Sequence, residues 1–247
     1  MVVADNIRCS HCGGPVEFKS GEIIATCTYC GFMTVIETGK AFSFEHSMLL
    51  NKFSQEQIES VVQNWMRSGF LKPSDLARKS RILEKSLVYL PIWVVSVGVT
   101  GKYKGIFERI APPIVKEGEI KKEYNWLVLA RKAASFPTRE YDIPLSGKVP
   151  YDFRKIEGFA KVLNSEMDKA EATELAKQQI DEHHRYLLQK DVDRIVEMAI
   201  ELDVRQVVYL HAPVWFIEYE YKGKSYQLVI DGVTGLALKG DIPAAKF

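Results

Sequence analysis

The chain has 247 residues, of which 47% are apolar and 26% charged, and its formal net charge is +1. This composition is that of a folded globular protein and excludes the disordered and fibrous classes. The near-neutral balance gives no global reason to expect nucleic acid or an anionic membrane as a partner. The charge is unevenly spread, because residues 70–155 hold 17 Lys and Arg against 9 Asp and Glu. The middle of the chain is therefore locally basic.

The beginning of the chain and its longest apolar stretch carry no sign of export or membrane insertion. Residues 1–5 lack a basic segment followed by an apolar one. The uncharged stretch 86–101 is shorter than a membrane span and contains Pro91 and Gly98. We therefore expect a cytoplasmic protein without a transmembrane segment, in a reducing compartment where disulfides are uncommon.

All four cysteines lie within the first 30 residues, as two pairs separated by 14 residues. The pairs are Cys9-Ser-His-Cys12 and Cys27-Thr-Tyr-Cys30, and a glycine follows each pair directly. A two-residue gap lets both thiolates of a pair reach one metal ion, and zinc prefers four such ligands in a tetrahedron. The spacing predicts one zinc ion bound by Cys9, Cys12, Cys27 and Cys30. Two disulfides or a redox pair are the alternative, which the lack of a βαβ pattern near the cysteines disfavours.

The segment between the two cysteine pairs is typical of a zinc ribbon. Residues 15–19 and 22–26 have strand character, and the turn signal Ser20-Gly21 separates them, so we expect a hairpin. Four thiolate ligands leave no open coordination position, so the zinc would be structural rather than catalytic. A ribbon of about 40 residues buries too little apolar surface to fold without its metal.

A helix is expected after the ribbon. Ser54 is a good N-cap, Gln57 completes a capping box, and Gly69 is a typical residue just beyond a helix C-terminus. Between them, one apolar face follows helical spacing. It consists of Ile58, Val61, Val62, Trp65 and Met66.

Two β-rich segments resemble each other. Residues 89–102 align without gaps with residues 211–224, at a constant offset of 122. Because a helical pattern also precedes each copy, we interpret the pair as a degenerate internal repeat. After the second copy, turn signals at Lys222-Gly223 and Asp231-Gly232 predict an antiparallel meander. The identical positions are Pro91 and Pro213, Trp93 and Trp215, Gly101 and Gly223, and Lys102 and Lys224.

Helices are also expected between the two copies. Apolar residues recur at helical spacing over 172–187, and a second such run covers 195–202. His183 and His184 lie in the first run beside acidic residues. Adjacent helical residues point in different directions and no HExxH spacing is present, so we interpret both histidines as surface and edge groups rather than metal ligands.

Together these elements predict an α+β protein. A zinc ribbon over residues 1–40 would be followed by an antiparallel-sheet and helix domain that contains the repeat. Its first unit, a helix with a β unit, would cover 41–150, and its second, long helices with the β-meander, would cover 151–247.

The combination of motifs resembles the TFIIB-type zinc-ribbon family of bacteria and archaea, over nearly the whole chain. The motifs are Cys9-x-x-Cys12-Gly13 and Cys27-x-x-Cys30-Gly31; Trp65 followed by Pro73; Tyr89-Leu90-Pro91-Ile92-Trp93; Pro213-Val214-Trp215; Tyr219-x-Tyr221-Lys222-Gly223-Lys224-Ser225-Tyr226; and Asp231-Gly232-x-Thr234-Gly235. The resemblance implies a zinc-binding protein, in some cases part of a membrane-stress assembly. Many members carry a membrane segment near the C-terminus. This chain instead ends soon after residues 240–243, so only peripheral membrane association would be expected of it.

Three functions follow as hypotheses. The leading one is a non-enzymatic adaptor that docks on a partner protein, because the zinc site would be closed. An enzyme is disfavoured, since the sequence has no Gly-rich phosphate loop, no GxSxG motif and no cysteine outside the zinc set. The alternative to the adaptor is binding of nucleic acid or the ribosome through the basic segment 70–155. Its candidate contacts are Lys72, Arg78, Lys79, Arg81, Lys102, Lys104, Lys121, Lys122, Arg131 and Lys132.

Overall fold

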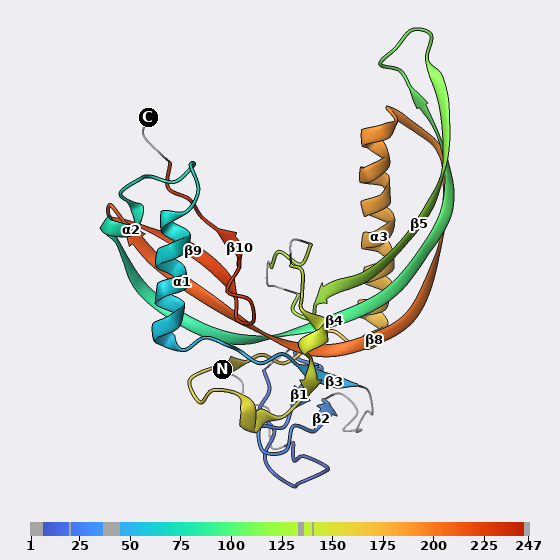
Figure 1. Cartoon of the computed structure of the whole chain (residues 1–247). Coiled ribbons are helices and arrows are strands. Elements are labelled where there is room, and N and C mark those ends of the chain that lie inside the picture. The colour runs from blue at the N-terminus through green and yellow to red at the C-terminus, as the bar shows by residue number, and fades with distance from the viewer. Residues whose placement is uncertain (1–6, 20, 37–44, 133–135, 140, 245–247) are drawn as a thin grey trace.

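The computed structural model describes residues 7–19, 21–36, 45–132, 136–139 and 141–244. In these ranges a small two-stranded sheet carries the cysteines, and a large mixed sheet with helices forms the rest (Figure 1). The α+β prediction is confirmed. The strands are β1 (Ile24–Thr26), β2 (Met33–Val35), β3 (His46–Met48), β4 (Ser80–Phe107), β5 (Ile114–Leu129), β6 (Val149–Pro150), β7 (Lys161–Val162), β8 (Arg194–Tyr221), β9 (Lys224–Asp231) and β10 (Ala237–Gly240). The helices are α1 (Gln55–Arg67), α2 (Leu76–Lys79) and α3 (Lys169–Asp191), with short 3-10 turns at Leu145–Gly147 and Phe153–Lys155.

The large sheet is built on two strands, β4 and β8, of 28 residues each. They pair antiparallel from Ser80↔Tyr221 to Ile106↔Arg194, with three register shifts along the way. Such irregularities bend a strand and increase its twist. Figure 1 shows the result as a U, in which β4 and β8 form the base and continue into both arms. We call the arm with α1, α2, β9 and β10 the α1 arm, and the arm with α3 and β5 the α3 arm.

The internal repeat is visible as two units with the same order, β3-α1-β4-β5 and β7-α3-β8-β9. β3 pairs in parallel with β8, and β7 pairs in parallel with β4 at the corresponding place. Equivalent backbone hydrogen bonds follow: Leu49 N to His211 O is 3.0 Å, and Leu163 N to Tyr89 O is 3.1 Å. Leu90, which aligns with Ala212 in sequence, also pairs with Ala212 across the two strands. An approximate two-fold axis therefore passes through this pair.

Each arm has its own tryptophan at its core. Trp93 is buried against α3, and Trp215 is buried against α1. Both indole N–H groups donate to the loop before the adjacent helix, Trp93 Nε1 to Met167 O at 3.1 Å and Trp215 Nε1 to Asn51 Oδ1 at 2.9 Å. Ile217, Tyr219 and Tyr221, which alternate along β8 after Trp215, are buried in the same hydrophobic core under α1.

The predicted helix after the ribbon is confirmed as α1. Gln57 N donates to Ser54 Oγ at 3.2 Å, and Ser54 N donates to Gln57 Oε1 at 2.8 Å, which is the expected capping box. Gly69 follows the helix with φ of +88°, a conformation that glycine adopts without strain. In the described part of the chain, none of the helices is both long and apolar enough to span a membrane.

The helix predicted over 195–202 is wrong, because these residues begin β8. Met198, Ile200 and Leu202 are partly buried, whereas Ala199 and Glu201 between them are exposed, a period of two. The spacing of the apolar residues fits a helix as well as a strand, and the long pairing with β4 decides in favour of the strand.

The meander of β8, β9 and β10 is confirmed, with one turn different from the prediction. Lys222 and Gly223 have φ of 50° and 76°, as a two-residue type I′ turn requires. The second turn is longer than Asp231-Gly232 suggested, since Asp231 N bonds to Leu236 O at 2.9 Å. Its positive φ falls at Gly235.

Candidate metal centre and buried polar clusters

The two cysteine pairs form nearly identical knuckles. Gly13 N donates to Cys9 O, and Gly31 N donates to Cys27 O, both at 2.8 Å. The two glycines have φ of +75° and +74°, a left-handed conformation that other residues adopt only with strain. Glycine after each pair therefore allows the chain to fold back around the sulfur atoms.

The four sulfurs are close enough to share one metal ion. Cys9 Sγ lies 3.5 Å from Cys30 Sγ, and Cys12 Sγ lies 3.7 Å from Cys27 Sγ. All four lie within 4.8 Å of one another, and all four are free thiols. A tetrahedron with zinc–sulfur bonds of about 2.3 Å has sulfur–sulfur edges of about 3.8 Å. The predicted cluster thus forms a site that could hold one metal ion, and its donors are those that zinc prefers.

Without a bound metal ion, the surroundings of the cysteines shift the pKa values of their thiols in different directions. Burial raises the pKa of Cys30 to about 12 and also raises the pKa of Cys27. Burial acts in the same direction on Cys9, but hydrogen bonds from the backbone of Cys12 and His11 outweigh it, and the pKa falls to about 7. Metal binding must displace the remaining protons, so metal affinity falls in acid.

The strand pairing within the ribbon differs from the predicted hairpin. β1 pairs antiparallel with β2, which lies beyond the second knuckle, rather than with residues 15–19. Pro15 instead forms an isolated bridge with Arg8. Gly21 has the positive φ of a turn, while Ser20 of the expected turn lies outside the described residues.

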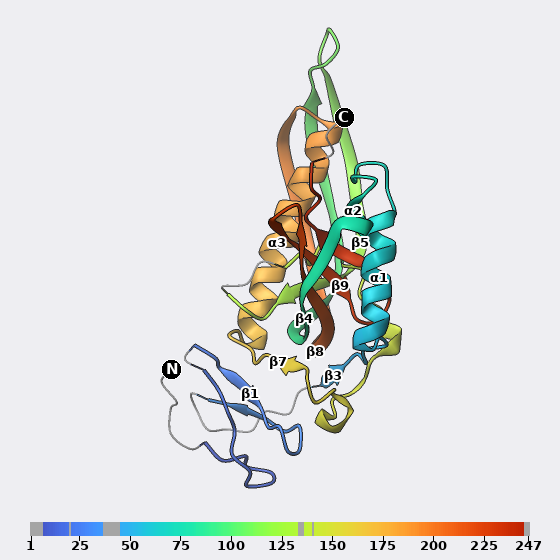
Figure 2. The ribbon, with the colours of Figure 1, turned by 90° about the vertical axis from the view of Figure 1, so that its left-hand side faces the viewer.

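The ribbon contacts the segment that leads from β7 to α3, and through this segment it packs next to the large sheet (Figure 2). β1 continues into a bridge between Ile24 and Ser165, and Thr26 N donates to Asn164 Oδ1 at 3.1 Å. Arg131 Nη1 binds Glu22 of the ribbon at 2.8 Å, and Arg131 Nη2 binds Glu166 at 2.9 Å. The side chain of Glu22 is only 3% exposed, so Arg131 neutralises a buried charge at this junction.

Arg131→Ala is expected to lower the free energy of unfolding by about 3–5 kcal/mol, because it leaves Glu22 buried without its cation and also removes the partner of Glu166. The adjacent Lys132 provides the control, since it pairs with Glu171 and both side chains are largely exposed. Lys132→Ala should cost less than about 1 kcal/mol. Denaturant unfolding of both variants with zinc bound would check this, and equal losses would contradict the role given to Arg131.

A pair of histidines lies at the base of the U, beside the ribbon. His211 Nε2 lies 2.9 Å from Leu163 O, and a carbonyl oxygen only accepts hydrogen bonds, so Nε2 carries the proton. His211 Nδ1 must then accept from His46 Nε2, 2.8 Å away. The His46 ring stacks on Tyr151 at 4.0 Å. Burial lowers the pKa of both imidazoles, that of His211 to about 4.

This pair should make the folded protein sensitive to acid. His211 is neutral in the folded state above pH about 4, whereas an unfolded histidine takes up its proton below about 6.5. The unfolded state therefore binds more protons in this window, and stability falls as the pH drops from about 6.5 to about 4, by roughly 3 kcal/mol for His211. Unfolding curves across this range should show a smaller loss for His211→Gln than for the natural chain.

The zinc site also titrates in acid, so the test of the histidine pair is the difference between variants at the same zinc concentration. His11 is exposed on the first knuckle and supplies the control. His11→Gln should keep the full loss of stability. If His211→Gln also keeps it, burial of His211 is not what makes the fold acid-sensitive.

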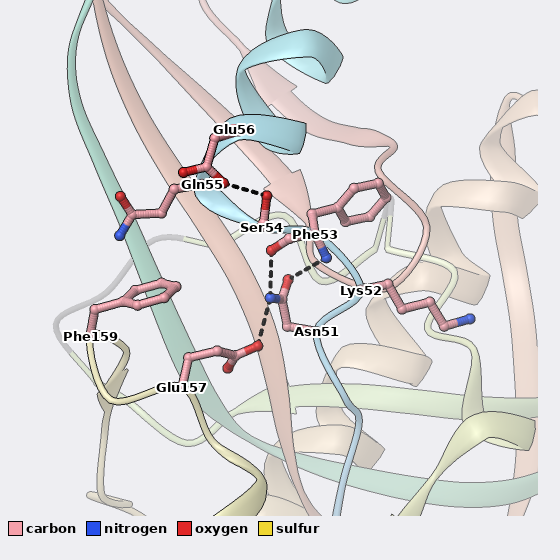
Figure 3. Close-up of a pocket in the computed structure, with 8 residues that line it drawn as sticks. All are labelled: Asn51, Lys52, Phe53, Ser54, Gln55, Glu56, Glu157 and Phe159. Carbon is pink, nitrogen blue, oxygen red and sulfur yellow. Dashed lines mark hydrogen bonds between the residues drawn. The ribbon is translucent and has the colours of Figure 1, made fainter.

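An open cavity of about 450 Å³ lies at the N-terminus of α1. Figure 3 shows Asn51 at its centre, where Asn51 Nδ2 donates to Phe53 O at 2.8 Å and to Glu157 Oε1 at 2.7 Å. Tyr89 Oη donates to Glu157 Oε2 at 3.0 Å. Since these polar groups already bond to one another, they hold the loops around Trp215 in place. The lining residues are Asn51, Lys52, Phe53, Ser54, Gln55, Glu56, Glu157 and Phe159.

The prediction that His183 and His184 are surface and edge groups is wrong for His184, which is buried. The buried face of α3 steps by four residues through Ala176 and Ile180 to His184. His184 Nε2 lies 3.4 Å from Tyr124 Oη of β5, while His183 packs at the edge of the helix. Among the described residues, the four cysteines form the only group arranged to hold a metal ion.

The candidate contacts of the basic segment 70–155 are spread over both arms and the ribbon junction, where Arg131 and Lys132 lie. In the α3 arm, Lys102 and Lys104 of β4 pair with Glu119 and Glu117 of β5, at 4.0 and 2.8 Å. There the cations alternate with carboxylates. The candidates between Lys72 and Arg81 lie instead at the end of the α1 arm, around α2. The described residues of this segment therefore do not form one continuous basic face.

No family model, curated protein or solved structure matches this chain. A function must therefore be argued from the four-cysteine site and from the surfaces of the chain.

Proposed function

We propose that this chain is a non-enzymatic, zinc-binding adaptor of the TFIIB-type zinc-ribbon kind that docks on a partner protein. One structural zinc ion would be bound by Cys9, Cys12, Cys27 and Cys30. The chain would act in the cytoplasm, and the family resemblance gives a peripheral membrane-stress assembly as its setting.

The observation that carries the proposal is a four-thiol cluster on a ribbon that is held against the large sheet. Four sulfur ligands complete the tetrahedron of a zinc ion and leave no position for a substrate. The bonds of Glu22 and Thr26 with Arg131 and Asn164 hold the ribbon in one orientation against the large sheet. A rigid, metal-stabilised module of this kind is suited to presenting a surface to another protein.

Affinity purification from native extract tests the proposal. The zinc-loaded chain should recover a protein partner in stoichiometric amount, and the metal-free Cys27→Ser variant should recover less of it. Recovery of no stoichiometric protein by the loaded chain would contradict an adaptor role, as would turnover with a broad panel of hydrolase substrates.

Nucleic-acid or ribosome binding is the second candidate, and the cations Lys72, Arg78, Lys79 and Arg81 at the end of the α1 arm favour it. Contact with phosphates would make affinity fall steeply as salt concentration rises. Binding of RNA and DNA measured across a salt series decides this, because no binding at low salt removes the candidate.

A further inference from the structure

The loop between α1 and α2 presents two large apolar side chains to solvent. Phe70 is 90% exposed and Leu71 is 60% exposed. The loop is held at its base, where Lys72 Nζ lies 3.6 Å from the centre of the Trp65 ring and donates to Trp65 O. Exposed apolar side chains that lie side by side can contribute to a contact site for another molecule.

The chain segments next to these two residues are rich in cations. Residues 67–82 and 220–225 lie together, since Ser80 pairs with Tyr221 and Asp75 binds both Lys79 and Lys222. These two segments hold seven Lys and Arg against two Asp and Glu, an excess of five positive charges. We call them the basic end surface. Besides Lys72, its cations are Arg67, Arg78, Lys79, Arg81, Lys222 and Lys224.

An open strand edge runs along the same surface. Between Ser80 and Leu87, β4 has β8 as its only strand neighbour among the described residues, because β7 joins it only at Val88 and Tyr89. Figure 2 shows this part of β4 in front of the sheet, with α1 to one side. An open edge offers backbone N–H and C=O groups to a further strand.

We infer that the basic end surface binds an extended acidic segment of a partner protein, which adds a strand to the open edge of β4. Its carboxylates would pair with the cations around α2, and an apolar side chain would contact Phe70 and Leu71. Such strand addition combines backbone hydrogen bonds, which give affinity, with side-chain contacts, which give specificity. The inference rests on the proposed adaptor function and specifies a second docking site for the partner, on the large sheet, in addition to the ribbon.

Nucleic acid, a lipid surface or a second copy of this chain would fit the basic end surface less well than an acidic segment. Single-stranded nucleic acid binds by stacking bases on several rings, and this loop offers one aromatic ring beside an aliphatic side chain. A lipid surface would accept Phe70 and Leu71 but would leave the strand edge without partners. A second copy would bring two basic surfaces together, and the like charges would repel.

Binding of defined peptides to the zinc-loaded full chain tests the inference. The probe is a fluorescent eight-residue peptide of alternating Glu and Leu, with a Lys-Leu peptide and a backbone N-methylated Glu-Leu peptide as controls. Only the unmodified Glu-Leu peptide should bind at low salt. It should also slow the amide hydrogen exchange of residues 80–87.

Matched variants locate the site. Phe70→Ser and the double variant Arg78→Glu, Lys224→Glu should each weaken peptide binding by about tenfold or more. Tyr186→Ser, at an exposed ring on α3, and Lys102→Glu with Lys121→Glu, on the α3 arm, should leave it unchanged. Equal binding of the N-methylated peptide, or no protection of residues 80–87, would overturn strand addition.

Other outcomes would assign the surface differently. The inference fails if oligouridine, or vesicles of phosphatidylserine in phosphatidylcholine, bind with the same variant dependence while the Glu-Leu peptide does not. It also fails if the chain forms a dimer that Phe70→Ser disrupts. A partner purified equally well by the natural chain and by the Phe70 and charge variants would keep the adaptor function and refute this docking site. Recovery of no partner by the natural chain would refute the adaptor function itself.

Discussion

Cys27→Ser is expected to abolish zinc binding and to unfold the ribbon, while the large sheet stays folded. Cys27 is fully buried, and among the described residues the buried members of the small core cluster around it are only Cys9, Val16 and Ala25. A structural zinc ion contributes on the order of 10 kcal/mol to folding in isolated zinc modules, far more than this core can supply. Loss of the metal should therefore release the ribbon from its position next to Ser165.

Metal analysis and amide hydrogen exchange check this expectation. The variant should contain almost no zinc, and residues 21–36 should lose protection while β4 and β8 retain it. The control is His11→Ala, in the same knuckle but outside the four-thiol set, which should keep zinc and protection. A ribbon that stays protected in metal-free Cys27→Ser would show that packing alone holds it.

Trp215→Ala is expected to lower the free energy of unfolding of the large sheet and its helices by about 3–5 kcal/mol, and Trp93→Ala should do the same. Each change removes a fully buried ring and its indole hydrogen bond, to Asn51 in one arm and to Met167 in the other. Because β4 and β8 run through both arms, damage to one arm should destabilise the other as well. We expect a single unfolding transition in each variant, shifted to lower denaturant.

Denaturant unfolding, followed by circular dichroism and by the fluorescence of the remaining tryptophans, measures this effect. Tyr186→Ala on the outer face of α3 is the control, since the ring is 57% exposed and its loss should change stability by less than about 0.5 kcal/mol. Two separate transitions in Trp215→Ala would mean that the arms fold independently, in conflict with the shared strands.

Local patterns predicted the local features. The cysteine spacing, the capping box at Ser54 and the Lys222-Gly223 turn depend on residues a few positions apart, and the structure has all three. The repeat was also recognisable, since proline and tryptophan recur at a constant offset. These signals depend on short-range geometry, which the sequence carries directly.

The long-range arrangement was not predictable in the same way. Aligning the two copies does not show that they pair with each other through Leu90 and Ala212, because strand register depends on the whole fold. For the same reason, the sequence did not show that β1 pairs with β2 rather than with the preceding segment 15–19. The contact between Glu22 and Arg131 joins residues 109 positions apart, and nothing in their neighbouring sequence marks it.

X-ray absorption at the zinc edge on the purified full chain tests the central claim most directly, together with the metal content of the same sample. The account predicts one zinc ion per chain, coordinated by four sulfur atoms at about 2.3 Å. Substoichiometric zinc, a nitrogen or oxygen ligand in the coordination shell, or cysteines paired as disulfides would contradict it.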